Sequence, residues 1–280
     1  MKKSLGYCAS LVVGFAMPAW AADSEISPST YGATHWGYVD FGAALFSGDE
    51  EAIAYDESWD GEEVFLKGAY VWNFASDYSF QLDVSSSSYS EDVSGETGGI
   101  NPYDFSRSGS SWDVMGHLTQ NTASGHCYGV YVDLGGSYSD DNIYAALGLE
   151  GQLNYDTWSL YGSLGGDYGI GGDAGSADSR AVVAQAKATY YVNPNLGLTG
   201  FLSGADETWS AGDNSQVNWG LSAEYKLNNS PISVYLEYDD MSFSGENAFD
   251  KWDGDQQTIW VGFRYHFKNG TLQQINQNTF

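Results

Sequence analysis

Cysteine, proline, basic residues and long apolar runs are all scarce in this sequence. Of its two cysteines, Cys8 lies in an N-terminal targeting segment, so the exported chain keeps only Cys127 and can form no internal disulfide bond. The five prolines form no linker that would divide the chain of 280 residues, and all-β proteins reach about this size as one domain. No segment after the N-terminus has the ~20 consecutive apolar residues of a transmembrane helix.

The N-terminus has the three parts of a secretory signal peptide. A charged start, Met1-Lys2-Lys3, precedes a mostly apolar run from Leu5 to Met17 and the small-residue site Ala19-Trp20-Ala21. A buried helix is the alternative interpretation, but these flanks are typical of a cleaved leader. The sequence therefore predicts a signal peptide at 1–21 and an exported mature chain.

Cys127 has three possible roles in an exported protein. A free thiol could link a dimer or form a redox site, but an unpaired cysteine is more often a small apolar residue that fills a strand. We predict the third role.

Basic residues are few. Without Lys2 and Lys3, 8 basic residues face 37 acidic ones, a net charge of −29. This charge argues against nucleic acid or anionic lipid as a partner and favours cations. Such a charge with few aromatics would predict disorder, but aromatics make up 16% of the chain, which can therefore bury or embed apolar surface.

Apolar and polar residues alternate in twelve segments, from Tyr38–Phe46 to Trp260–Phe267. In the last segment Val261, Phe263, Tyr265 and Phe267 share one parity, and Arg264 and His266 share the other. A period of two places these sets on opposite faces of a strand. The sequence therefore predicts about twelve antiparallel strands.

The connections between these segments alternate between long and short. The long ones are Ser47–Glu62, Ser90–Ser110, Gly135–Asn142, Gly169–Ser179, Gly204–Ser215 and Ser244–Asp255. The tight turns, rich in residues that suit turn dihedrals, are Ala75–Asp77, Asn121–Gly125, Asn154–Asp156, Asn193–Asn195 and Asn228–Pro231. This alternation is typical of outer-membrane barrels, which have long extracellular loops and short periplasmic turns.

Aromatic residues of the apolar parity gather at both ends of the segments. Those at or near the ends with short turns are Trp72, Phe74, Tyr78, Phe80, Tyr128, Tyr155, Trp158, Tyr190, Tyr225, Tyr265 and Phe267; those at the other ends are Trp112, Tyr168, Trp219 and Tyr238. A soluble antiparallel sandwich would also have one apolar face per strand, but two aromatic belts are selected by a membrane. We predict a closed antiparallel transmembrane β-barrel.

The segment Trp260–Phe267 resembles the closing-strand signal of Gram-negative outer-membrane β-barrel proteins. Gly262, Tyr265 and Phe267 fit that signal, and Trp260 stands where a polar residue is usual. The resemblance, to the small porin-like type, implies that this strand guides insertion and closes the barrel. Outer-membrane lipid and the outer-membrane insertion machinery are the partners it implies.

The family usually ends on its closing strand, but here residues 268–280 follow it. Both parities of this tail are polar, which predicts a periplasmic extension that could fold back into the barrel mouth. The predicted division is therefore signal peptide 1–21, N-terminal periplasmic segment 22–34, barrel 35–267 and polar tail 268–280.

The polar parity should face the barrel interior. Its charged and histidine members, the predicted pore-lining residues, are Asp40, Lys67, Asp83, Asp113, His117, Asp133, Glu150, Asp167, Lys187, Glu224, Lys226, Glu237, Asp239 and Arg264. Twelve strands lie between the filled barrels of about 8 strands and the open ones of about 16. Both a narrow open or gated pore and a sealed lumen, with Lys67, Lys187, Lys226 and Arg264 paired to carboxylates, are therefore consistent with the sequence.

Acidic residues also cluster in the long connections, for example Asp49-Glu50-Glu51, Asp206-Glu207 and Asp250 to Asp255. Such oxygen groups could hold calcium or magnesium, but none has EF-hand spacing and solvated acidic loops are the alternative. The sequence assigns no metal ligand.

The mature histidines do not form a known catalytic motif. None of His35, His117, His126 and His266 opens the His-x-Ser arrangement of outer-membrane phospholipases or closes the Asp-x-His pair of the aspartyl-type proteases. We therefore expect neither enzymatic activity nor a cofactor.

These patterns together favour a porin-like channel in the cell outer membrane. It would pass small hydrophilic solutes by diffusion, with cations preferred. The alternatives are a sealed structural or surface-interaction barrel with divalent-cation-binding loops and, third, an outer-membrane enzyme. The sequence assigns no oligomeric state.

Overall fold

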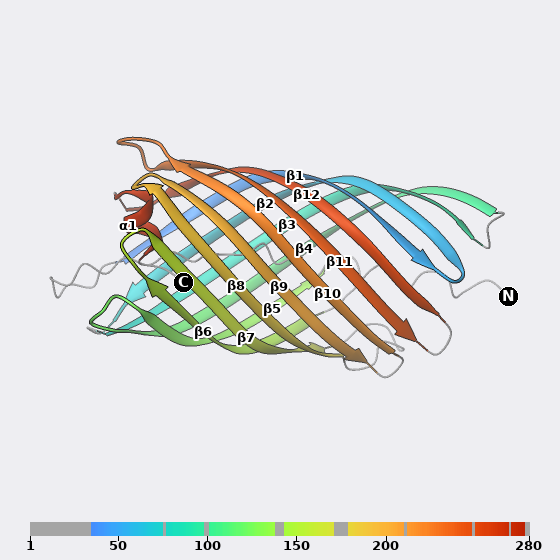
Figure 1. The fold of residues 1–280 in the computed structure, drawn as a ribbon, viewed down its shortest axis with the longest axis horizontal. Coiled ribbons are helices and arrows are strands. Elements are labelled where there is room, and N and C mark those ends of the chain that lie inside the picture. Colours follow the sequence, from blue (N-terminus) through green and yellow to red (C-terminus); the bar gives the residue numbers. More distant parts are fainter. Residues whose placement is uncertain are drawn as a thin grey trace.

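Twelve antiparallel strands close into one barrel within the residues that the computed structural model describes, which are 35–74, 77–97, 101–137, 143–170, 179–209, 212–247, 250–268 and 270–277 (Figure 1). The strands are β1 (His35–Ala52), β2 (Tyr55–Asn73), β3 (Tyr78–Thr97), β4 (Asn101–Asn121), β5 (Cys127–Ser137), β6 (Ile143–Asn154), β7 (Trp158–Ile170), β8 (Arg180–Asn193), β9 (Leu196–Trp209), β10 (Gly212–Lys226), β11 (Ile232–Asn247) and β12 (Lys251–His266). The predicted fold is confirmed. The predicted signal peptide and the segment 22–34 lie outside the described residues.

The first and last strands pair with each other and close the barrel. Their register runs from Tyr38 opposite His266 to Ala52 opposite Trp252. Around the closed part of the sheet every strand is hydrogen-bonded to a neighbour on both sides, so that part has no free edge. This is the condition for a sheet to cross lipid, which offers no hydrogen-bond partners.

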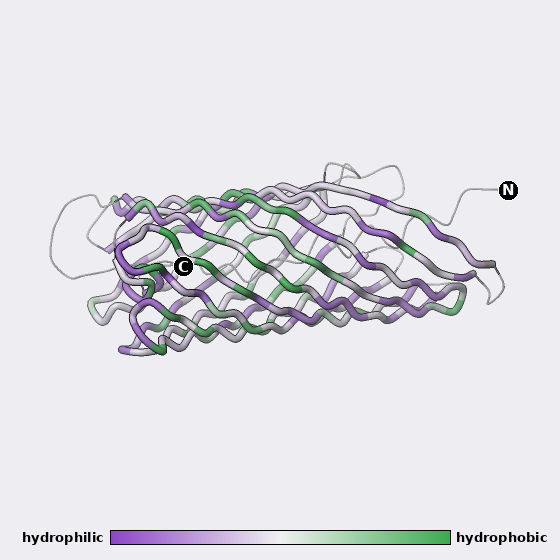
Figure 2. The backbone as a smooth tube through the Cα atoms, turned by 90° about the horizontal axis from the view of Figure 1, so that it is seen from above, coloured by the Kyte–Doolittle hydropathy of each residue, from purple (hydrophilic) through white to green (hydrophobic). Residues whose placement is uncertain are grey.

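The strands turn their apolar side chains outward. Phe41, Leu149 and Val261 are 46%, 65% and 58% exposed. The residues that alternate with them along each strand point inward. Hydrophobic residues gather along the middle of the barrel, and the end where the longest hairpins project is mainly hydrophilic (Figure 2). An apolar outer face of this kind is suited to lipid.

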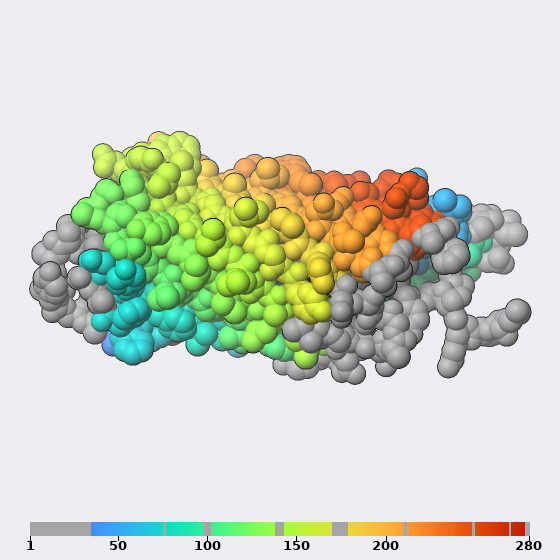
Figure 3. Space-filling view, turned by 90° about the horizontal axis from the view of Figure 1, so that it is seen from below, coloured from blue at the N-terminus to red at the C-terminus, as the bar shows by residue number. Residues whose placement is uncertain are grey.

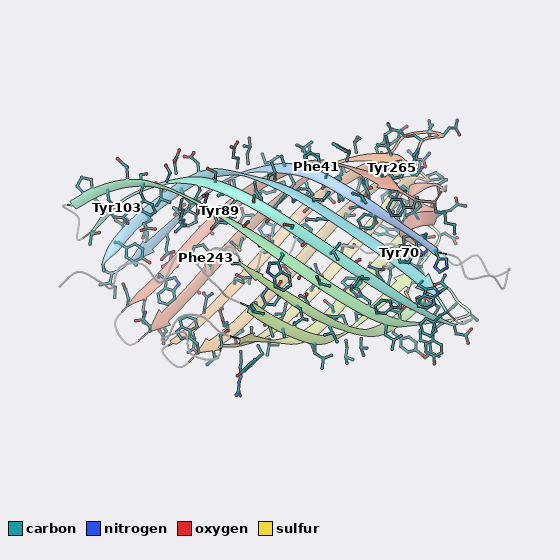
Figure 4. All side chains as sticks on the ribbon, turned by 180° about the vertical axis from the view of Figure 1, so that it is seen from behind. Phe41, Tyr70, Tyr89, Tyr103, Phe243 and Tyr265 are labelled. Carbon is teal, nitrogen blue, oxygen red and sulfur yellow. The ribbon has the colours of Figure 1, made fainter. Side chains whose placement is uncertain are left out.

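The outer surface also carries the predicted aromatic belts. Trp72, Tyr128 and Phe267 are about half exposed at one end of the barrel, and Tyr168 and Trp219 are exposed toward the other. We call the first end, where β1 begins and β12 ends, the periplasmic end, and the opposite one the extracellular end. Tyr70 and Tyr265 lie toward the periplasmic end, and Tyr89 and Tyr103 toward the extracellular end (Figure 4).

The extracellular hairpins are long, as predicted, but most of their length is strand rather than loop. The range Ser47–Glu62, predicted as a connection, is paired as β1 and β2 except at residues 53–54. Strand pairing likewise takes up most of Ser90–Ser110 and Ser244–Asp255, and β9 continues to Trp209. Polar side chains do not end a strand that has left the membrane, because water solvates its outer face.

Strand length changes abruptly around the barrel. β4 has 21 residues and its neighbour β5 has 11. The hairpins β1–β2 and β3–β4 therefore extend beyond the shorter strands β5 to β7 (Figure 1). The space-filling view shows β4 to β12 side by side as a continuous wall, from green to red (Figure 3).

Several inward-facing glycines lie beneath an aromatic ring of the adjacent strand. Gly42 faces Phe65, and Gly262 faces Tyr235, whose ring would be 2.5 Å from a side-chain carbon at that position. No other residue leaves room for these rings. The pairs fill the barrel interior close to its wall.

The C-terminal tail contains a short helix, α1 (Leu272–Asn276). Thr271 caps it, because its hydroxyl accepts a hydrogen bond from the Gln274 amide while the Gln274 side chain accepts one from the Thr271 amide. Among the described residues, no helix is long and apolar enough to cross a membrane.

We expect the folded barrel to run at a different position on gels before and after boiling. A closed strand ladder unfolds slowly in detergent, whereas the boiled chain binds detergent along its whole length. The measurement is mobility of the mature protein extracted from outer membranes with detergent. Recovery as a monomer that needs no detergent would contradict the membrane barrel.

Candidate functional site: the barrel interior

The predicted pore-lining residues all face the barrel interior. Ten are buried: Asp40, Lys67, Asp83, His117, Asp133, Glu150, Asp167, Lys187, Lys226 and Asp239. The other four, Asp113, Glu224, Glu237 and Arg264, are half-buried. That they line a path for solutes stays a prediction.

An arginine joins two of these carboxylates near the periplasmic end. Arg264 on β12 donates to Asp40 and Glu224 with N–O distances of 3.1 Å each. Tyr235 donates to the second oxygen of Asp40 at 3.1 Å, and the guanidinium lies 4.5 Å from the centroid of the Tyr38 ring. These contacts satisfy most polar atoms of a buried charge cluster, the condition under which such a cluster is stable.

A histidine joins two further predicted residues. His117 Nε2 lies 3.0 Å from Asp83, and Nδ1 lies 2.9 Å from Glu150. Carboxylate oxygens only accept, so the ring carries a proton on both nitrogens when it bonds both carboxylates. Gln81 donates to Asp83 and Tyr161 to Glu150, so this cluster is also closely bonded.

The interior lysines of β2 and β8 contact aromatic rings. Lys67 Nζ lies 4.3 Å from the Phe65 ring centroid and 5.6 Å from that of Trp260. Lys187 Nζ lies 5.8 Å from the ring centroid of Tyr161. Both lysines interact electrostatically with Glu237, so the sealed-lumen hypothesis describes part of the interior correctly. Lys226 is separate, because it donates to the carbonyl of Ser230 in a periplasmic turn.

Several acids within or beside the predicted long connections face the interior. Glu50, Glu91 and Glu207 are buried, and Glu63 is half-buried. Each shares the inward parity of its own strand. Extending the parity of β1 from Asp40 through Gly42, to Glu50, would have identified the first of them.

The extracellular hairpins enclose an apolar cluster inside the barrel. Trp59, Val93, Met241 and Phe243 are buried there, and Phe46 and Trp252 pack against them. Glu91 forms an ion pair with Arg107 on the same wall. This side of the outer mouth is therefore packed, and one of its acids is paired.

The tail lies across the periplasmic mouth. Ile275 packs on Trp36 of β1 and Val71 of β2, while Asn154 of β6 donates to the carbonyl of Gln277 at 2.7 Å. On a third side, the Gln273 amide donates to Pro194, between β8 and β9, at 2.9 Å. Strands β6, β8 and β9 are each at least four places from β1 and β2 around the barrel, so the tail bridges opposite walls.

The residues of the predicted assembly signal occupy the closing strand and the rim beside it. Gly262 faces inward beneath Tyr235. Tyr265 and Phe267 point outward, 48% and 54% exposed, with ring centroids 5.9 Å apart. Their role in insertion stays a prediction.

Cys127 is buried on β5 against Tyr161, as predicted for a strand filler. Within the part of the chain that the structure describes, no three His, Cys, Asp or Glu residues are placed to hold a metal ion. Asp140 and Asp141 lie outside the described residues.

Comparison with known proteins adds the fold family. No protein-family model and no curated protein matches the sequence. Among solved structures, the COG4313 outer membrane channel from Pseudomonas putida F1 is 14% identical, with 88% of this chain and 98% of that one covered at a TM-score of 0.60. The transport unit of the autotransporter AIDA-I from Escherichia coli is 12% identical, with 86% and 93% covered at a TM-score of 0.52. This chain therefore has the fold of the Gram-negative outer-membrane β-barrels.

Proposed function

We propose that the barrel is an outer-membrane channel through which small hydrophilic solutes diffuse, with cations preferred. The observation that carries the proposal is the acidic excess on the inner face of a closed membrane barrel. Arg264 and His117 each serve two carboxylates. The interior therefore keeps a negative charge, which low-dielectric walls focus on the ions that enter.

The second candidate is a sealed barrel. The buried ion pairs and the tail across the periplasmic mouth favour it, since both narrow the interior. The two candidates differ in one observable, which is conductance across a planar bilayer.

Replacing both Asp113 and Asp133 by Asn is expected to lower the cation-to-anion permeability ratio. Reversal potentials in a salt gradient would measure it. The loss should be at least about twofold near 0.1 M salt, where the screening length is about 10 Å, and should fade at higher salt. Asp206→Asn with Asp213→Asn is the matched control, because these two exposed acids on β9 and β10 face outward. Anion preference in the unmodified protein would contradict the proposal, and an absence of conductance would favour the sealed barrel.

A further inference from the structure

A row of acidic side chains crosses the inner wall near the extracellular ends of the short strands. Cross-strand pairing links Asp133, Ala146, Asp167, Ala181, Glu207 and Asn214 in sequence around β5 to β10. Acceptor groups on β5, β7 and β9 thus alternate with alanines on β6 and β8. We call Asp133, Asp167 and Glu207 the acidic row, which the neutral Asn214 adjoins on β10.

Each member of the acidic row has an oxygen that no donor of the described residues satisfies. Neither oxygen of Asp133 has a donor in good hydrogen-bond geometry, although the Leu134 amide and the Asp113 carboxyl group lie near them, and one oxygen each of Asp167, Glu207 and Asn214 also lacks a partner. Asp133, Asp167 and Glu207 are 0%, 7% and 4% exposed. Buried acceptors without donors are costly, and for carboxylates a positive partner removes most of that cost.

A second carboxylate stands beside the first member of the row. Asp113 interacts electrostatically with Asp133, and Asp167 does so as well. Tyr144 donates to Asp113 at 2.9 Å. Asp113 is opposite Gly135, two residues from Asp133, so the two carboxylates project from diagonal positions on β4 and β5.

The basic residues of the barrel are placed elsewhere. Arg264 serves Asp40 and Glu224, and Lys67 interacts with Asp40, Glu63 and Glu237. Arg180 is next to Ala181 of the row, but it is exposed and lies 6.0 Å from the centroid of the Tyr168 ring on the outer face. Among the described residues, the acidic row therefore has no ion-pair partner of its own.

Oxygen-only, anionic groups of this kind select hard cations. Neighbouring strands are about 4.8 Å apart, so consecutive acids of the row, which are two strands apart, are separated by roughly 10 Å. That separation agrees with the absence of a three-residue metal set in the described structure. With this spacing, each acid can contact a passing cation separately, and no three of them can hold one resident metal ion.

We propose that the Asp113–Asp133 pair is a binding site for a calcium-like hard cation, and that Asp167 and Glu207 continue it as weaker stations along the wall. The site deepens the proposed cation preference and rests on it for the route by which ions reach the row. The alanines between the stations add no polar atom that would compete for an ion.

Terbium(III) binding to the refolded protein in detergent tests the site. Terbium is an oxygen-seeking substitute for calcium, and tyrosine excitation sensitises its emission, which Tyr144 is placed to provide. Asp113→Asn with Asp133→Asn should weaken terbium affinity at least about tenfold, since charged ligands dominate binding of hard cations. Asp206→Asn with Asp213→Asn should change it less than about twofold, because these acids face outward. Added calcium should displace terbium from the unmodified protein.

Three results decide the proposal. Equal loss in the two double variants would mean diffuse binding to surface acids and would overturn the site. Unchanged affinity in the Asp113/Asp133 variant would also overturn it, and would indicate that the two carboxyl groups share a proton instead. If that variant does not fold, as judged by the heat-dependent gel shift, Asp167→Asn takes its place. Its terbium affinity should fall, by less than in the double variant. An unchanged affinity would count against the acidic row.

Conductance of the same samples separates the site from the channel. Terbium binding that depends on Asp113 and Asp133 in a barrel without conductance would support the site and refute the channel. Cation-selective conductance with unchanged terbium binding would support the channel and refute the site.

Discussion

Deleting residues 268–280 is expected to raise the conductance of the barrel by at least about twofold, because its narrowest section limits a pore. The tail crosses the periplasmic mouth between the β1–β2 wall and the turns that precede β7 and β9. Single-channel recordings of the refolded protein would measure the change. Assembly should continue, since the tail follows the closing strand and belongs to no strand pair.

The tail stays in the mouth through packing rather than through its own helical stability. A helix of five residues is not stable alone. Leu272 and Ile275 are 0% and 4% exposed, and burial of such side chains contributes about 1.5–3 kcal/mol each. Leu272→Asp with Ile275→Asp should therefore open the mouth in a chain of full length.

Deletion of residues 278–280 alone is the matched control, because it keeps α1 and its contacts. Conductance should then remain that of the unmodified protein. If removal of 268–280 leaves conductance unchanged, the tail does not obstruct the path. If it prevents assembly, the insertion signal lies in the tail rather than at Phe267.

Replacing Phe267 by Ser is expected to reduce the amount of protein inserted in the outer membrane severely. Phe267 extends the outward parity of the closing strand, and its amide donates to Gly37 at 2.8 Å where β12 meets β1. Serine removes an apolar ring worth about 2–3 kcal/mol in transfer to lipid, at the position that the closing-strand signal assigns to an aromatic residue. Fractionation of membranes, followed by the gel-shift test for folded barrel, would measure the loss.

Phe74→Ser is the control that separates the assembly signal at Phe267 from the general lipid contact of an aromatic ring in the belt. Phe74 is 50% exposed at the same periplasmic end, beyond β2, so it loses a similar lipid contact. Only Phe267→Ser should impair insertion strongly. Similar losses in both variants would indicate a general effect of the aromatic belt.

Strand parity, together with the aromatic belts and the alternation of long and short connections, predicts the architecture. Because side chains alternate strictly, residues such as Val261 and Arg264 could be assigned to opposite faces without knowing the register. At acidic stretches the polar neighbours of Glu50 and Glu207 favour a loop, and that prediction is wrong. A strand outside the membrane needs no apolar face, so the parity rule holds there too.

The contacts inside the barrel could not be predicted in this way. Parity shows that Asp83, His117 and Glu150 face inward, but which of them meet depends on the stagger of β3, β4 and β6 around a tilted barrel. The tail helix was also missed, although Thr271 and Gln274 have the spacing of a capping box. One turn of helix has too few residues to show a hydrophobic period.

The rings above glycines have a consequence for how the strands find their partners. If β1 slipped by one residue against β2, its inward side chains would all turn to lipid. A slip by two would preserve the faces, but Phe65 would then lie over Asp40 or Ala44 instead of Gly42. Either side chain occupies the space that the ring needs. Each glycine and its ring thus favour the native pairing over a slipped one.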